Sequence, residues 1–167
     1  MLKIVFALFA CSLFMAHADD VVVNVTGRIA ASPCNVDAGT TNQTVDLGQA
    51  VATDFKQAGA GSKWHDFDLK LSGCPATTTY AAALFMGQPD STSTTKFANL
   101  GTSTGLALDI ENRNHDTSYG PNDRFTVPVN DSDHKATFPL SARMYSTSGT
   151  VTGGSFSSVV QVVFVYN

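Results

Sequence analysis

The C-terminal segment, residues 155–167, has the alternation of a β-strand and reads SFSSVVQVVFVYN. One face of this strand carries large apolar side chains at the period of two that a strand requires, namely Val160, Val162, Phe164 and Tyr166. The other face is apolar as well. A strand that is apolar on both faces belongs inside a β-sandwich, paired along both edges. Since no residues follow Asn167 to form the next strand, we expect a sandwich that lacks one strand.

The first eighteen residues have the features of a signal peptide rather than of a folded segment. Lys3 precedes an apolar run over residues 4–15, which is too short for the roughly 20 residues that cross a bilayer. Ala16-His17-Ala18 matches a cleavage site, so we expect residues 1–18 to be removed and the chain to be exported. A lipoprotein cleavage site ending at Cys11 is the alternative, which the bulky Phe9 disfavours.

Cleavage would leave two of the three cysteines, Cys34 and Cys74. An exported chain with two cysteines is expected to pair them, because thiols oxidise outside the cytoplasm. The mature chain would also lose Lys3, which takes the net charge from −4 to −5. A lightly charged, acidic protein gives no support to a nucleic-acid partner.

Short alternating segments separated by turn residues predict an all-β sandwich of immunoglobulin-like type. The strands are expected at residues 28–35, 44–47, 64–71, 80–86, 106–110, 125–129, 136–145 and the C-terminal segment. Pro128 indicates an edge or a bulge and Pro139 an irregular strand, since proline cannot donate to a ladder. A single helical turn is possible within residues 57–62. We expect one domain over residues 31–167.

A further alternating segment lies near the N-terminus, at residues 19–30. One of its faces carries Val21, Val23, Val25, Gly27 and Ile29. A sandwich that lacks a strand exposes an apolar groove, and a strand from another chain can fill it by β-strand addition. We therefore interpret residues 19–30 as a donor strand for a neighbouring subunit.

These features together resemble pilin subunits of the chaperone–usher pathway, most closely a minor tip-fibrillum subunit of type 1 fimbriae. The matching residues are the alternating extension with Gly27, the pair Cys34 and Cys74, Trp64-His65-Asp66-Phe67-Asp68-Leu69, Cys74-Pro75, Phe138-Pro139-Leu140, Gly154 as fourteenth residue from the end, and the penultimate Tyr166.

The resemblance implies a structural subunit of an adhesive fimbria on the bacterial surface. A periplasmic chaperone would lend a strand to the groove and contact Val160, Val162, Phe164 and Tyr166. At the outer-membrane usher, the extension of the next subunit would replace the chaperone, and the subunits would join head to tail. Gly27 would meet a shallow part of the groove.

Enzymatic functions find little support in the sequence. Residues 101–105 form a G-x-S-x-G pattern around Ser103, but a nucleophile elbow needs a strand before it and a helix after it. The three neighbouring His/Asp pairs do not converge on a metal, because adjacent strand residues point to opposite faces. We expect no cofactor, metal or small-molecule substrate. Two alternatives remain open, a tip adhesin that binds a receptor and a self-contained secreted β-sandwich.

Overall fold

The computed structural model describes residues 24–27 and 33–167. The predicted signal peptide and most of the predicted donor segment, including Val21, Val23 and Ile29, lie outside these residues. The elements are β1 (Asn35–Val36), a 3₁₀ helix η1 (Ala52–Phe55), β2 (His65–Ser72), β3 (Tyr80–Gly87), β4 (Phe97–Ala98), β5 (Leu106–Asn112), β6 (Arg124–Pro128), β7 (Ala136–Ser146) and β8 (Val160–Tyr166). No helix in this described part is long and apolar enough to cross a membrane.

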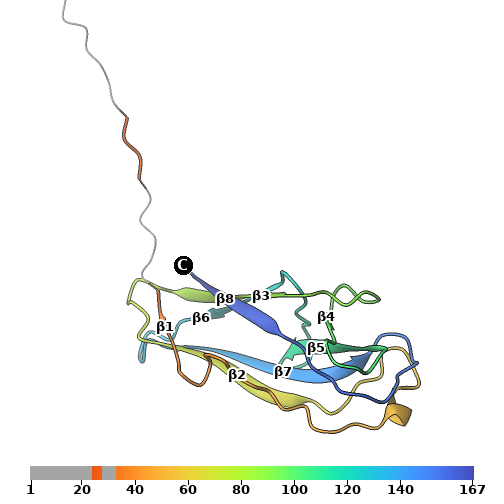
Figure 1. Ribbon diagram of the computed structural model, residues 1–167. Helices are drawn as coiled ribbons and strands as arrows, with labels where there is room; N and C mark the ends of the chain where they lie inside the picture. The colour runs from red at the N-terminus through yellow and green to blue at the C-terminus, as the bar shows by residue number, and fades with distance from the viewer. Residues whose placement is uncertain (1–23, 28–32) are drawn as a thin grey trace, which may run out of the picture.

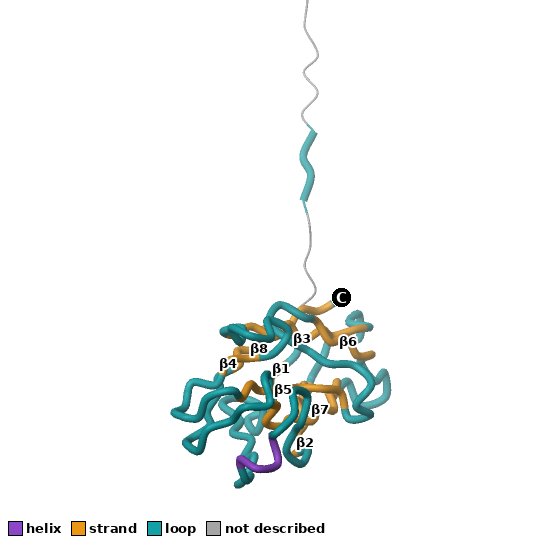
Figure 2. The backbone as a smooth tube through the Cα atoms, turned by 90° about the vertical axis from the view of Figure 1, so that its right-hand side faces the viewer, coloured by secondary structure: helices purple, strands orange, loops and turns teal. Residues whose placement is uncertain are grey.

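The strands form two antiparallel sheets that face each other (Figure 1). The larger sheet has the order β1-β2-β7-β5-β4 and the smaller one the order β6-β3-β8. Seen along the layers, β6, β3 and β8 lie above the strands of the larger sheet (Figure 2). The prediction of an all-β, immunoglobulin-like sandwich is confirmed.

The core lies between the two sheets and follows the alternation of the sequence. On β7, Phe138, Leu140 and Ala142 are buried in the core cluster. Leu69 and Leu71 of β2 join the same cluster, whereas Lys70 between them is exposed. Along much of β2 and β7, buried residues thus alternate with more exposed ones, as expected where one face of a sheet meets the core and the other meets water. β5 differs, because its residues from Leu106 to Ile110 are all buried.

Cys34 and Cys74 form a disulfide with a Cα–Cα distance of 4.2 Å, which confirms the predicted pairing. The bond lies where β1 begins, and β1 pairs Asn35 with Ser72 at the end of β2. Both cysteines are buried in the main core cluster. The bridge therefore fastens the start of the folded domain to the turn after β2.

Two predicted elements differ from the structure. Residues 44–47 are extended loop instead of a strand, and they have no strand neighbour in the described part of the chain. The helical turn occurs at Ala52–Phe55, earlier than residues 57–62, because the buried Phe55 fixes it to the core. Between β3 and β5 the structure adds the short strand β4, whose Phe97 is fully buried.

The two prolines in strands have different outcomes. Pro128 ends β6, which is an edge strand of the smaller sheet, so the predicted edge position is confirmed. Pro139 lies inside the continuous strand β7, and the predicted irregularity is wrong. The carbonyl of Pro139 accepts a hydrogen bond from Arg113, one residue beyond β5. The N–H and C=O groups of one strand residue face the same edge, so an N–H at Pro139 would also point toward β5. The pairing of β5 with β7 ends at Asn112 and Leu140, so the missing N–H of Pro139 lies at the end of this ladder.

Candidate functional site

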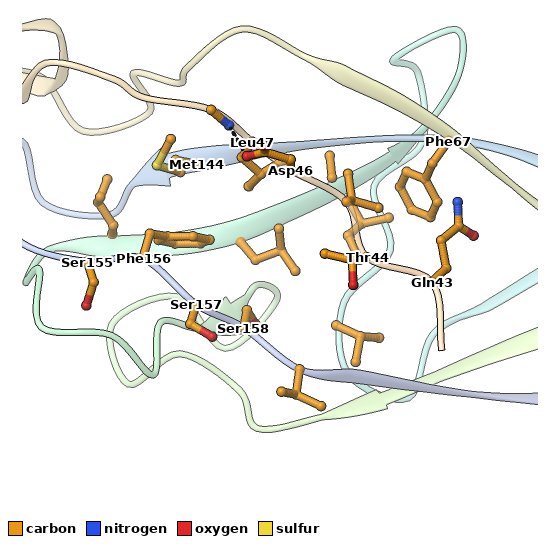
Figure 3. A pocket seen from close by; sticks show the side chains of 18 of the residues that line it. Gln43, Thr44, Asp46, Leu47, Phe67, Met144, Ser155, Phe156, Ser157 and Ser158 are labelled. Carbon is orange, nitrogen blue, oxygen red and sulfur yellow. Dashed lines mark hydrogen bonds between the residues drawn. The ribbon is translucent and has the colours of Figure 1, made fainter. Parts of the chain in front are cut away.

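A long groove runs along the sandwich between β8 and the segment formed by residues 42–50 (Figure 3). Its volume is about 1390 Å³. One wall is the chain from Val151 through β8, and the other is the chain from Gln43 to Ala50. In the close-up view, Gln43, Thr44, Asp46 and Leu47 lie on one side and residues 155–158 on the other.

The floor of the groove is apolar and is built by both sheets. It is lined by Phe67 and Leu69 of β2, Phe85 of β3, Leu106, Leu108 and Ile110 of β5, and Ala142 and Met144 of β7. These residues belong to the two core clusters of the sandwich. Asp46 is the one charged residue among those that line the groove, and its carboxylate accepts a hydrogen bond from the Gly48 N–H at 2.8 Å. The site therefore suits an uncharged, apolar occupant.

The β8 wall has an unpaired backbone edge. β8 pairs antiparallel with β3 on one side and has no second neighbour in the described sheets. Its residues Val160, Val162 and Phe164 pack against the core and line the groove. Val163 and Val165 point to the opposite, exposed face. The C-terminal strand was expected to pair along both edges, but among the described residues it pairs only with β3.

The facing wall is also unpaired. Among the described residues, the backbone of residues 42–50 makes no hydrogen bond with another backbone group. Val45 and Leu47 nevertheless pack against the core, so the segment is held by side chains rather than by a ladder. An unpaired polar backbone beside an apolar cavity is costly unless water or another chain satisfies it. The two walls thus present backbone donors and acceptors on both sides of one groove.

Most of the predicted groove residues do line the groove. Gly154, Val160, Val162 and Phe164 are among its lining residues. Tyr166 lies beyond it, packed against the core near the end of the sheet, and burial raises the pKa of its phenol above the usual value of 10.0. The position of these residues is therefore known, whereas their role in binding stays a prediction.

Residues 24–27 of the predicted donor segment are described, and two of them, Val25 and Gly27, belong to its predicted apolar face. Val25 is 87% exposed, and a Cβ placed on Gly27 would have no heavy atom within 4 Å. Neither side chain position is therefore used by the fold of the described chain. Their role as donor residues stays a prediction.

Phe156 and the second wall of the groove are two features of the site that were not expected from the sequence. Phe156 packs against both core clusters from the loop before β8. The signal was present, because Phe156 and Ser158 continue the period of two that leads into Val160. Residues 44–47 of the second wall are predicted as a strand. The sequence pattern does not reveal that this segment has no neighbouring strand in the described part of the chain.

Ser103 has a structural position. Its side chain is buried, and its hydroxyl donates a hydrogen bond to the carbonyl of Thr152 at 2.7 Å. A nucleophile elbow instead exposes its serine on a turn between a strand and a helix. The G-x-S-x-G pattern here belongs to a loop that binds the chain entering β8.

The comparisons with known proteins agree with this geometry. The fimbrial protein family model matches residues 23–167. The chain is 35% identical over 161 residues to protein FimG of Escherichia coli strain K12, covering 96% of this chain and 93% of the relative. It is 38% identical over 159 residues to S-fimbrial adhesin protein SfaS of E. coli O6:K15:H31, covering 95% of this chain and 93% of the relative.

A solved structure shows the same fold. The crystal structure of the P pilus rod subunit PapA matches with a TM-score of 0.67 at 22% identity, covering 81% of this chain and 100% of PapA. A sandwich with an open apolar groove and fimbrial relatives over nearly its whole length defines a structural subunit of a surface pilus. The chain belongs to the fimbrial protein family, and its likeness to FimG fits a minor subunit of a chaperone–usher pilus.

Proposed function

We propose that the groove accepts an extended strand donated by a neighbouring subunit, and that residues 21–29 of this chain fill the same groove in another subunit. The observation that carries this proposal is the pairing of an apolar, nearly uncharged floor with two unpaired backbone edges. A β-strand is the one kind of occupant that uses all three features. Its apolar face covers the floor, and its backbone pairs with both walls.

The energetics favour a strand with several large apolar side chains. Burial of each such side chain contributes about 1.5–3 kcal/mol, so four of them contribute roughly 6–12 kcal/mol before the cost of ordering the strand. Ordering costs about 1–2 kcal/mol per residue, which offsets much of that gain. Backbone pairing with β8 must therefore supply part of the affinity, and the open edge of β8 provides it.

The donor segment has the composition that such a groove requires. Val21, Val23, Val25 and Ile29 would be the large side chains on its apolar face. Gly27 would lie over a shallow part of the accepting subunit's groove, where a larger side chain would not fit. The exposed Val25 and the empty surroundings of Gly27 are consistent with a segment that finds its partner on another molecule.

Before assembly, the same groove would hold a strand of a periplasmic chaperone, which protects the apolar floor from aggregation. At the outer-membrane usher, the donor segment of the next subunit would replace the chaperone strand. The contact joins unlike surfaces, so it extends as a filament instead of closing into a ring. This role requires no catalytic group.

Deletion of residues 19–29 tests the donor assignment. The shortened subunit should still accept a strand but should be unable to donate one, so it should terminate a fibre at that end. The distribution of the tagged subunit along fibres, read by immunoelectron microscopy, distinguishes the two roles. A variant with Asn24→Ala serves as a control, because Asn24 lies on the face opposite to Val25. Incorporation of the shortened subunit at interior positions would overturn the assignment.

A further inference from the structure

The chain that enters β8 is held by a loop rather than by a strand. The ladder between β3 and β8 ends at the pair formed by Gly87 and Val160. Upstream of this pair, the loop 99–104 binds residues 152–157 through a set of hydrogen bonds that we name the clasp. The clasp contains the G-x-S-x-G pattern of residues 101–105, which the proposed function of the groove does not explain.

Backbone groups form the first part of the clasp. Leu100 N–H donates to the carbonyl of Ser157 at 2.6 Å, and Ser103 N–H donates to the carbonyl of Ser155 at 3.0 Å. Asn99 Oδ1 accepts a hydrogen bond from Ser157 N–H at 2.9 Å. Both serines of the entering chain are thus paired as if a strand lay beside them.

Hydroxyl groups complete the clasp. Thr102 Oγ1 accepts a hydrogen bond from Ser155 N–H at 2.9 Å, and Thr102 N–H donates to Ser155 Oγ at 3.0 Å. Ser103 Oγ donates to the carbonyl of Thr152 at 2.7 Å. Thr102, although exposed, and the buried Ser103 therefore both hold the neighbouring segment.

Two glycines allow the close approach of the two segments. A Cβ on Gly101 would lie 2.2 Å from the carbonyl oxygen of Ser155. A Cβ on Gly154 would lie 2.6 Å from the nitrogen of Ser103. Both contacts are with backbone atoms, which cannot swing away as a long side chain can. The position of Gly154 in the entering chain thus has a packing reason.

The clasp and β3 bind the same edge of the chain. Tyr80 and Asn167 exchange both backbone hydrogen bonds, at 3.1 and 3.0 Å. In an antiparallel ladder such pairs alternate with pairs that exchange none, so the odd-numbered residues of β8 face β3. The even-numbered residues therefore point their N–H and C=O groups to the open edge.

The same parity continues upstream of β8. The clasp binds the backbones of Ser155 and Ser157, which are odd-numbered as well, and residues 155–159 contain no turn or bend. Phe156 and Ser158 then direct their backbone groups to the groove, which both residues line. The open edge is continuous from Phe156 to Tyr166.

We propose that the clasp is a positioning element that lengthens the strand-accepting edge beyond β8. It would add the four residues 156–159 to the edge, about 13 Å at the usual rise per residue. One end of the donated strand would pair there instead of with β8. This inference rests on the proposed function of the groove and assigns Asn99 and Thr102 as the residues that set the length of the accepted strand.

Peptide exchange tests this assignment. The full exported chain is complexed with a fluorescent peptide of residues 20–32, and the dissociation rate is measured in excess unlabelled peptide. Two shorter peptides, residues 20–28 and 24–32, remove one end each. Two variants weaken the clasp, Asn99→Ala and the milder Thr102→Val. Asn99→Asp is a conservative replacement that keeps the acceptor oxygen. Thr126→Val, on the exposed face of β6, is the matched control.

The expected result is position-specific. Asn99→Ala and Thr102→Val should speed dissociation of the full peptide about tenfold, which corresponds to the loss of one or two hydrogen bonds. One of the shortened peptides, the one that lacks the end lying over residues 156–159, should dissociate at the same rate from the variants and from the unchanged chain. Asn99→Asp should give a dissociation rate between those of Asn99→Ala and the unchanged chain, because it keeps the acceptor for Ser157 N–H but loses the hydrogen bond that Asn99 Nδ2 donates to the carbonyl of Ser103 at 2.7 Å. Thr126→Val should leave the rate unchanged.

Two other results would overturn the assignment. If the full peptide dissociates at the unchanged rate from both clasp variants, the clasp has no part in strand acceptance. If both shortened peptides are weakened as much as the full one, the clasp supports the fold in general rather than one end of the groove. Absence of any peptide binding to the unchanged chain would instead contradict the proposed function itself.

Discussion

Phe138 of β7 and Phe164 of β8 lie with their ring centroids 5.6 Å apart and their planes tilted by 44°, and they connect the two sheets beneath the groove. Phe138 is fully buried, whereas Phe164 is half-buried and lines the groove. The core and the groove are therefore continuous. A donated strand would complete the burial of Phe164, so filling the groove and stabilising the sandwich are one process.

Replacement of Phe164 by alanine should destabilise the subunit that holds a donated strand by about 3–5 kcal/mol, the range for a fully buried phenylalanine. Urea unfolding of the subunit with an appended donor strand measures the loss. Val165→Ala is the matched control, since Val165 is 40% exposed on the outer face and should cost under about 1 kcal/mol. Equal losses for both variants would contradict the inward orientation of Phe164.

Replacement of Asp109 by asparagine should destabilise the domain by about 3 kcal/mol, because it leaves two cations without their counter-charge. Asp109 is fully buried and forms ion pairs with Lys96, whose side chain is 11% exposed, and with Arg143 at 3.0 Å. Asp68→Asn is the control and should cost about 1 kcal/mol or less, since its partners Arg113 and Lys70 are partly exposed. Denaturant unfolding of both variants measures the two losses of unfolding free energy. Equal losses would show that burial does not make the Asp109 ion pairs more important for stability than the exposed ones.

Loss of the disulfide should cost roughly 4 kcal/mol, from the chain entropy of closing a loop of about 40 residues. Cys34→Ser, Cys74→Ser and the double variant should lose the same amount, because each removes the same bond. The amount of soluble subunit recovered from the periplasm and its denaturation midpoint provide the measurement. Recovery and midpoint equal to those of the unchanged chain would show that the sheets alone hold residue 34 in place.

Stability should fall at alkaline pH because of two tyrosines, the buried Tyr119 and the half-buried Tyr166. Burial raises the pKa of Tyr119 and of Tyr166 above 10.0, and the charge of Asp116 adds to the effect at Tyr119. A folded-state pKa above the unfolded value stabilises the protein at pH below about 10, and this contribution is lost as the pH rises through the folded pKa. Unfolding midpoints between pH 8 and 11.5 should therefore decrease less for the variant Tyr119→Phe/Tyr166→Phe. An identical decrease would assign the effect to other groups.

The alternation of apolar residues was sufficient to predict most strands and the face that each one buries. His65–Ser72, Tyr80–Gly87 and Val160–Tyr166 lie within one or two residues of the predicted ranges or inside them. Periodicity cannot show which backbone edges find a partner, because pairing depends on distant segments. Residues 44–47 have the pattern of a strand, yet in this structure they border an open groove.

The polar contacts were less accessible to sequence reasoning. Trp64 lies stacked on His115 with the ring centroids 4.3 Å apart, and the guanidinium of Arg143 lies 4.1 Å from the centroid of the Trp64 ring. Asp109 and Lys96 are thirteen positions apart and meet only because β4 pairs with β5. Such contacts depend on which strands are neighbours in the sheet, and the alternation of apolar residues along one strand does not predict this.

If this sandwich requires a strand from another chain, an appended donor strand should raise its thermal stability, which unfolding of three proteins measures. One protein is the mature chain without residues 19–29, and a second carries residues 20–32 through a flexible linker after Asn167. A third carries the same appended segment with Val21, Val23 and Val25 changed to asparagine. We expect a midpoint more than about 10 °C higher for the second protein than for the other two. Equal midpoints for all three would mean that the sandwich is complete alone and needs no donated strand.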